Sequence, residues 1–110
     1  MNTFNVNLSI DEVIYKLESV IVDGSITGEL LDKYEIKGLE EMKTVVLVYE
    51  KHYYRAGNRL TLTVTIDNFT GTTRVHYIGG GGGQGLFRFD WGAGENFGSI
   101  VYITLSDYII

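Results

Sequence analysis

Apolar and polar residues alternate at the start of the chain, and the period then changes. The alternation over residues 3–10 predicts a strand with one buried face, carried by Phe4, Val6, Leu8 and Ile10. Apolar residues at helical spacing follow and predict a helix over about residues 10–22: Val13, Ile14, Leu17, Val20 and Ile21. Ser9 or Asp11 suits the N-cap of this helix, and Gly24 its end.

The middle of the chain has the pattern of successive strands joined by short turns. Residues 26–36 fit either a strand or an irregular segment, and we predict a strand. Residues 45–54 are rich in β-branched and aromatic side chains, which is typical of strands. Residues 60–67 alternate leucine, valine and isoleucine with threonine and Asp67, which predicts a polar face toward solvent. Residues 73–78 alternate in the same way.

The last third of the chain predicts one more strand and a second helix. Phe87, Phe89 and Trp91 alternate with charged residues, which indicates a short strand. Apolar residues then recur at steps of four from residue 97 onward and favour a helix: Phe97, Val101, Leu105 and Tyr108. A strand over residues 99–105 is the competing interpretation, because β-branched residues are frequent there.

This order, β-α-β-β-β-β-β-α, predicts a single α+β domain over residues 1–110. Short turns between strands imply hairpins and antiparallel pairing, and the apolar face of the strands needs a covering layer. We therefore expect a curved antiparallel sheet with two helices packed on one face. The arrangement resembles a reduced helix-grip fold, by analogy of fold only.

Charge and composition narrow the classes of partner. The formal net charge is −5 and the pI is near 4.9, which argues against binding to nucleic acid or anionic membranes. The chain contains no cysteine, so thiol chemistry is excluded. The first residues lack the features of a signal peptide, so a cytoplasmic location is expected.

A glycine-rich segment at Gly79–Gly83 and Gly85 is the most unusual feature of the chain. Gly80, Gly82 and Gly85 fit the glycine spacing of the dinucleotide-binding motif, but a strand rather than a helix is predicted after them. The lysine that a P-loop requires after its last glycine is also missing. The favoured interpretation is sheet geometry, since glycines in strands mark bulges and close backbone approach. A ligand-contacting loop, and a flexible or oligomer-contact loop, are the alternatives.

If the segment does contact a ligand, six residues form the predicted contact surface: Gly81, Gly82, Gly83, Gln84, Arg88 and Trp91. Backbone amides of successive glycines can hold an anion, and Arg88 would add a positive charge. Arg88 could instead pair with Asp90 on the solvent side of a strand. No cofactor and no metal ion are expected.

Catalytic signals are weak. His76 with Asp90 or Glu50 is the one acid–base combination that the predicted strands could bring together, and His52 with His76 and a carboxylate could bind a metal. Histidines on strands are more often solvent-facing residues. No serine has the context of a nucleophile elbow. We therefore do not expect an enzyme, although the alternative stays open.

The segment from Tyr77 through the glycines to Leu86-Phe87-Arg88-Phe89-Asp90-Trp91-Gly92-Ala93 resembles a family of small, single-domain bacterial proteins of unknown function. The likeness also includes residues 48–51 and 57–59. It implies a bacterial, cytoplasmic protein and transfers no catalytic residue.

The function indicated by these observations is binding of an unknown small molecule or protein beside the glycine-rich segment. One alternative is a structural or homo-oligomerising protein whose glycines serve only the sheet. In that case the C-terminal residues Tyr108, Ile109 and Ile110 could pack into a homodimer.

Overall fold

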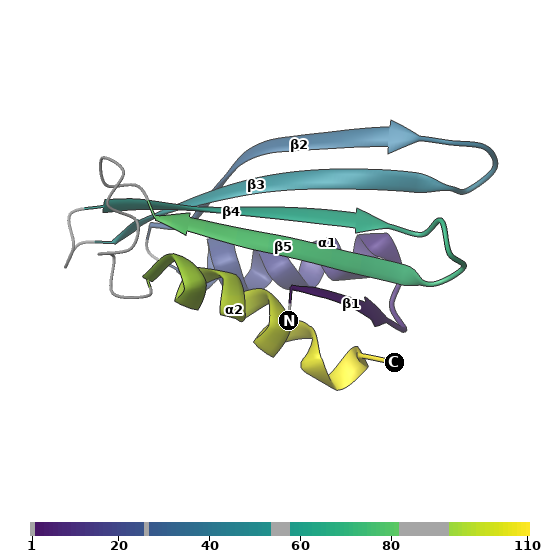
Figure 1. Ribbon diagram of the computed structural model, residues 1–110. Helices are drawn as coiled ribbons and strands as arrows, with labels where there is room; N and C mark the ends of the chain where they lie inside the picture. Colours follow the sequence, from purple (N-terminus) through teal and green to yellow (C-terminus); the bar gives the residue numbers. More distant parts are fainter. Residues whose placement is uncertain (1, 26, 54–57, 82–92) are drawn as a thin grey trace.

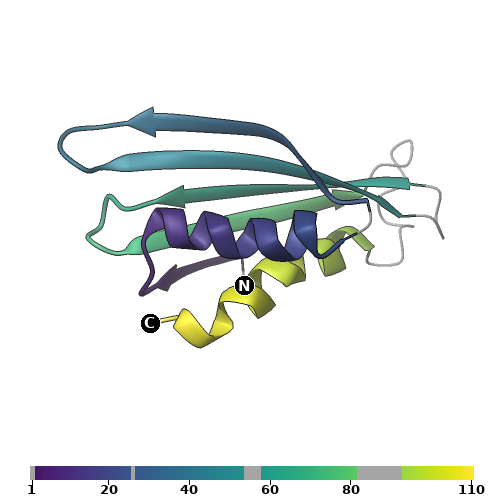
Figure 2. The same cartoon turned by 180° about the vertical axis from the view of Figure 1, so that it is seen from behind.

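The computed structural model describes residues 2–25, 27–53, 58–81 and 93–110 (Figure 1). In these ranges the chain forms β1 (Thr3–Val6), α1 (Ile10–Glu18), β2 (Glu29–Lys37), β3 (Lys43–Tyr53), β4 (Asn58–Asp67), β5 (Thr73–Gly81) and α2 (Ala93–Leu105). The strands form one antiparallel sheet in the order β1-β5-β4-β3-β2. Both helices lie on the same face of this sheet, as the reverse view shows (Figure 2).

The predicted α+β fold is therefore confirmed, with two helices on one face of an antiparallel sheet. The predicted strand at residues 87–91 lies outside the described residues. The strand predicted at residues 26–36 is present as Glu29–Lys37. None of the helices that the structure describes is long and apolar enough to cross a membrane.

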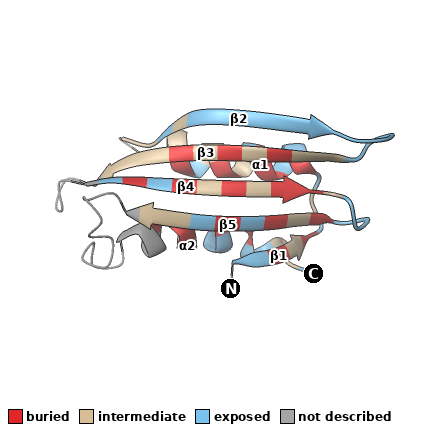
Figure 3. Ribbon diagram, turned by 45° about the horizontal axis from the view of Figure 1, so that its top comes forward, coloured by how far each residue is buried: buried red, intermediate tan, exposed pale blue. Residues whose placement is uncertain are grey.

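The core lies between the sheet and the two helices (Figure 3). Each central strand contributes its alternate residues to this layer, as the sequence pattern predicts: Val45, Leu47 and Tyr49 from β3, Leu60, Leu62, Val64 and Ile66 from β4, and Thr73, Val75 and Tyr77 from β5. None of the helices in the described ranges lies on the opposite face of the sheet (Figures 1 and 2). The described part of the domain is therefore two layers thick, and one face of its sheet is uncovered.

The first helix begins at a capping box. The Ser9 hydroxyl accepts a hydrogen bond from the Glu12 amide at 3.1 Å, and the Glu12 carboxylate accepts one from the Ser9 amide at 2.9 Å. Its buried face carries Val13, Ile14 and Leu17, as predicted. The prediction for Val20 is wrong, since this side chain is exposed. A π-helical turn, η1 (Ser19–Asp23), follows α1 and changes the phase of the apolar face.

The second helix confirms the period-four pattern, because Phe97, Val101 and Leu105 are all buried. A short 3₁₀ turn, η3 (Ser106–Tyr108), continues it to the C-terminal residues. Those residues run back beside β1.

Candidate functional site

The glycine-rich segment is only partly within the described residues. Gly79, Gly80 and Gly81 belong to β5 and pair with Leu62, Thr61 and Leu60 of β4. The other predicted contact residues lie outside the described ranges: Gly82, Gly83, Gln84, Arg88 and Trp91. The predicted ligand-contact surface therefore stays a prediction.

The described glycines allow close packing around β5. A Cβ atom on Gly80 would lie 3.1 Å from the Thr61 hydroxyl oxygen. On α2, a Cβ atom on Gly98 would lie 3.3 Å from the Tyr77 ring and 3.6 Å from the Gly79 amide nitrogen. The helix thus approaches the strand at a point where both carry glycine. At these positions the glycines have a role in sheet and helix packing.

The two histidines are not brought together. β4 lies between β3, which carries His52, and β5, which carries His76. Register places Glu50 opposite Thr61, whereas His76 faces Thr65. Four residues of strand separate these rows, about 13 Å at the usual rise. The register therefore excludes two of the alternatives, the pairing of His76 with Glu50 and the two-histidine metal site, and Asp90 lies outside the described residues.

Two of the residues considered for catalysis, His76 and Glu50, each have another contact. The His76 Nδ1 atom lies 2.7 Å from the Thr3 hydroxyl oxygen across the β1–β5 pair. The Glu50 carboxylate forms an ion pair with the Arg59 guanidinium at 3.5 Å. Among the described residues, no group of three or more potential metal ligands from His, Cys, Asp and Glu comes together.

Arg74 forms an ion pair that the sequence pattern did not reveal. Its Nε and Nη2 atoms donate to the two carboxylate oxygens of Asp67 at 3.0 and 3.1 Å. Asp67 is buried, so its assignment to a solvent-facing row is wrong. The two residues face each other across the β4–β5 hairpin, and the turn that the sequence predicts between them was the available signal. The pair closes the hairpin.

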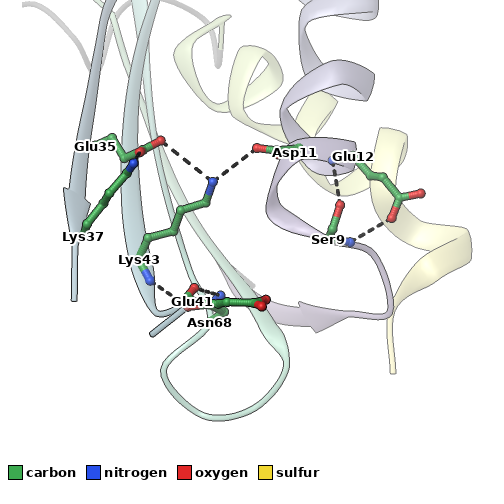
Figure 4. Close-up of polar contacts among 8 residues, drawn as sticks. All are labelled: Ser9, Asp11, Glu12, Glu35, Lys37, Glu41, Lys43 and Asn68. Atoms are coloured by element: carbon green, nitrogen blue, oxygen red, sulfur yellow. Dashed lines mark hydrogen bonds and ion pairs between the residues drawn. The ribbon is translucent and has the colours of Figure 1, made fainter. Parts of the chain in front are cut away.

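A polar recess lies where the β2–β3 hairpin meets the start of α1 (Figure 4). Its volume is about 410 Å³. The Lys43 ammonium lies 3.4 Å from the Asp11 carboxylate and 3.8 Å from that of Glu35. Asn68 joins the neighbouring turns by accepting from the Lys43 amide and donating to the Glu41 carbonyl. The charges in the recess are thus used to hold the hairpin against the helix.

Tyr49 carries a buried hydroxyl with no hydrogen-bond partner among the described residues. Burial, with a smaller contribution from the charge of Glu18, raises the pKa of Tyr49. Burial also raises the pKa of Tyr77, with a contribution from Tyr102. Tyr49 lies directly opposite Leu30 of β2, so the buried phenol sits where the outermost strand joins the sheet.

The uncovered face of the sheet presents rows of side chains that cross several strands. One row runs Tyr34, Val46, Thr65, His76 and Thr3, from β2 at one edge to β1 at the other. The next row contains Asp32, Val48, Thr63 and Ile78. Tyr34 and Ile78 are both 58% exposed. Both rows therefore mix apolar residues with threonine and other polar residues, and ion pairs lie toward the two ends of this face: Glu50 with Arg59, and Asp67 with Arg74.

The edge of the sheet at β1 is covered by the C-terminal residues of the same chain. The Asn7 amide donates to the Tyr108 carbonyl at 2.9 Å, and the Ile110 amide donates to the Asn5 carbonyl at 3.0 Å. Ile109 forms a β-bridge with Val6. The Lys16 ammonium lies 4.7 Å from the centre of the Tyr108 ring. Tyr108 and Ile109, predicted as dimer contacts in one alternative, thus pack within their own chain.

The other edge, at β2, is bare. In the described part of the chain β2 pairs only with β3, and eight of its nine residues are exposed (Figure 3). Three exposed residues are large and apolar: Leu31, Tyr34 and Ile36. A long edge strand with exposed apolar residues offers its outer backbone groups to another strand. This edge is the surface that the described geometry makes available for binding.

Comparison with known proteins identifies a family, but the function of that family is unknown. The model of a family of unknown function (DUF6054) matches residues 1–109. No curated protein and no solved structure matches the chain.

Proposed function

The chain belongs to the DUF6054 family, whose function is unknown, and we propose that it is a protein-binding domain that takes an additional strand at the bare edge of β2. The observation that carries the proposal is the contrast between the edges. The chain covers β1 with its own C-terminal residues and leaves β2 exposed along its length. Strand addition gains affinity from main-chain hydrogen bonds and specificity from alternate side chains.

The side chains on the two faces of β2 define which partner strand would fit beside it. Tyr34 and Ile36 face the uncovered side of the sheet, and Lys33 and Glu35 face the helix side. A matching strand would carry apolar residues on one face and opposite charges on the other. Nucleic acid and membrane lipid are not part of the proposal, because the net charge is −5.

A second candidate function is binding of a small molecule beside residues 82–92. It rests on the glycine-rich sequence and on the predicted contact residues, and the packing of Gly79–Gly81 leaves it open. A bacterial, cytoplasmic setting also belongs to the proposal, and it rests on the family resemblance of the sequence.

Native mass spectrometry of the protein purified from its own host tests the proposal, with two proline variants beside the wild type. Amide direction alternates along an antiparallel strand, so one of Tyr34→Pro and Glu35→Pro removes an amide directed away from β3. The variant that removes the outward amide keeps the hydrogen bonds to β3, so it should have the higher melting temperature of the two, and thermal melting identifies it.

We expect the wild type to carry the mass of an additional protein chain and the outward proline variant to lose it. A wild type with the mass of one chain, or an added chain that survives the outward proline, would contradict strand addition. A small added mass would support the small-molecule candidate instead.

A further inference from the structure

We infer that the strand added at β2 is the β2 strand of a second copy of this chain, paired antiparallel about a two-fold axis at Tyr34. The inference rests on the proposed function, since it names the partner for the same edge. It follows from the order of charges along the strand, Lys33, Glu35 and Lys37, which alternate in sign on one face.

The faces of β2 limit the possible registers. After the bulge between Leu30 and Asp32, residues 32, 34 and 36 face the uncovered side, and residues 33, 35 and 37 face the helix side. A shift of one residue would place opposite faces together. A two-fold axis normal to the sheet must therefore pass through a residue of β2 and not between two residues.

Charge selects among the registers that remain. An axis at Tyr34 places Lys33 opposite Glu35 of the second copy, twice by symmetry, and overlaps residues 31–37. An axis at Lys33 or at Glu35 places like charges directly opposite each other, which is destabilising. An axis at Asp32 places two carboxylates together. An axis at Ile36 pairs Glu35 with Lys37, but it overlaps only residues 35–37 of the strand.

The contacts within one chain leave Lys33 available for this pairing. None of the ion pairs among the described residues includes Lys33. Glu35 lies 3.6 Å from the Lys37 ammonium and 3.8 Å from that of Lys43, and its side chain is still 33% exposed. In the dimer the carboxylate of Glu35 would gain Lys33 of the second copy as a further cation.

Symmetry also gives the dimer a new surface. Two five-stranded sheets joined at β2 form one sheet of ten strands, with all helices on one side. The row that contains Tyr34, Val46 and Thr65 then continues through the two tyrosines into the same row of the second copy. Tyr34 and Val46 of one copy then lie beside Tyr34 and Val46 of the other across the axis.

Charge exchange in the full chain tests the register. Lys33→Glu and Glu35→Lys each place like charges opposite one another at two symmetric positions, and we expect each to weaken dimerisation roughly tenfold in sedimentation equilibrium. The double variant, and an equimolar mixture of the two single variants, should restore it. Lys33→Glu is the cleaner single change, because it removes no ion pair described within the chain.

The absence of cysteine allows a second test by disulfide formation. Tyr34→Cys places two thiols at the axis, within reach of a disulfide. Ile78→Cys is the matched control, since both side chains are 58% exposed in the wild type. Under mild oxidation we expect a covalent dimer from Tyr34→Cys and a monomer from Ile78→Cys.

The outcomes separate the inference from the proposed function. Two results in a dimerising wild type would overturn the register. One is a double variant that does not recover dimerisation, and the other is a Tyr34→Cys variant that cross-links no faster than Ile78→Cys. A different protein chain that is lost with the outward proline would overturn the second copy and leave strand addition standing. A wild type that binds no chain would overturn both.

Discussion

The two edges of the sheet differ in whether other residues of the described chain cover them. At β1 the C-terminal residues supply backbone partners to Asn5 and Asn7 and a bridge to Val6. At β2 the outer backbone groups and the side chains of Leu31, Tyr34 and Ile36 meet solvent. An edge that is covered contributes to the stability of the monomer, and an edge that is bare is available to a partner.

Few side-chain contacts attach β2 to the rest of the described structure. Its one half-buried residue is Leu30, which lies opposite the buried Tyr49 of β3. The strand otherwise depends on its backbone pairing with β3 and on the ion pairs of Glu35. Changes at β1 should therefore affect folding, and changes on the outer part of β2 should affect association.

The largest effect is expected from removal of residues 108–110. This deletion removes the backbone hydrogen bonds to β1 and the packing of Tyr108 and Ile109 on the core. We expect the free energy of unfolding in urea to fall by about 3 kcal/mol. Ile110→Ala is the control, because it keeps the backbone contacts and changes an exposed side chain. Equal stability of the deletion and the wild type would show that the C-terminal residues do not secure β1.

A smaller loss is expected from Gly28→Ala, just before β2. A Cβ atom at this position would lie 2.0 Å from the Ile21 carbonyl oxygen, so the backbone must shift. We expect a loss of about 2 kcal/mol in the same measurement. Gly38→Ala, at the other end of β2, is the matched control, since its nearest contact would be an ordinary 3.4 Å from the Met42 Cβ atom. Losses of the same size in both variants would contradict this explanation.

Tyr49→Phe should stabilise the fold by about 1 kcal/mol, because it removes a buried hydroxyl without a partner in the described structure. The pKa of Tyr49 is raised in the folded state, so the unfolded chain ionises first as the pH passes 10. The free energy of unfolding should therefore fall with rising pH above 10. Tyr77, whose pKa is raised in the same direction, contributes to this fall.

The alkaline fall should be smaller in Tyr49→Phe than in the wild type. Tyr15→Phe is the control, because Tyr15 is 73% exposed. An alkaline profile that is identical in all three proteins would exclude Tyr49 as a source of the pH dependence.

The smallest effect on the monomer is expected from Ile36→Thr on the outer part of β2. Its side chain is exposed, and threonine keeps the β-branched shape, so the unfolding free energy measured at low protein concentration should change by less than about 0.5 kcal/mol. A loss of unfolding free energy as large as that of the C-terminal deletion would show that side-chain packing attaches β2 to the sheet.

The sequence predicts the elements that have one buried face. Period-two alternation identified β4 and β5, and steps of four identified α2, because burial on one face leaves a regular pattern. β2 has little pattern, since nearly all of its residues are exposed and its pairing with β3 defines it. The sequence placed Asp67 in a solvent-facing row, since its burial depends on a cross-strand partner, Arg74.

Neither sheet edge could be assigned from the sequence. The bridge between Val6 and Ile109 joins residues from the two ends of the chain, and no local pattern reports such a contact. The candidate site was accordingly sought in the glycine-rich segment, which has the most unusual composition. The structure directs attention to β2, whose composition is ordinary and whose exposure appears only once the sheet is assembled.

Hydrogen exchange at the two edges, followed by mass spectrometry at low and high protein concentration, tests the central claim most directly. Exchange of the amides in residues 29–37 should slow as concentration rises, because the bare edge then acquires a strand. Exchange in residues 3–7 should not change, since the C-terminal residues already cover that edge. Exchange in β2 that is independent of concentration, or slowing confined to β1, would contradict the account.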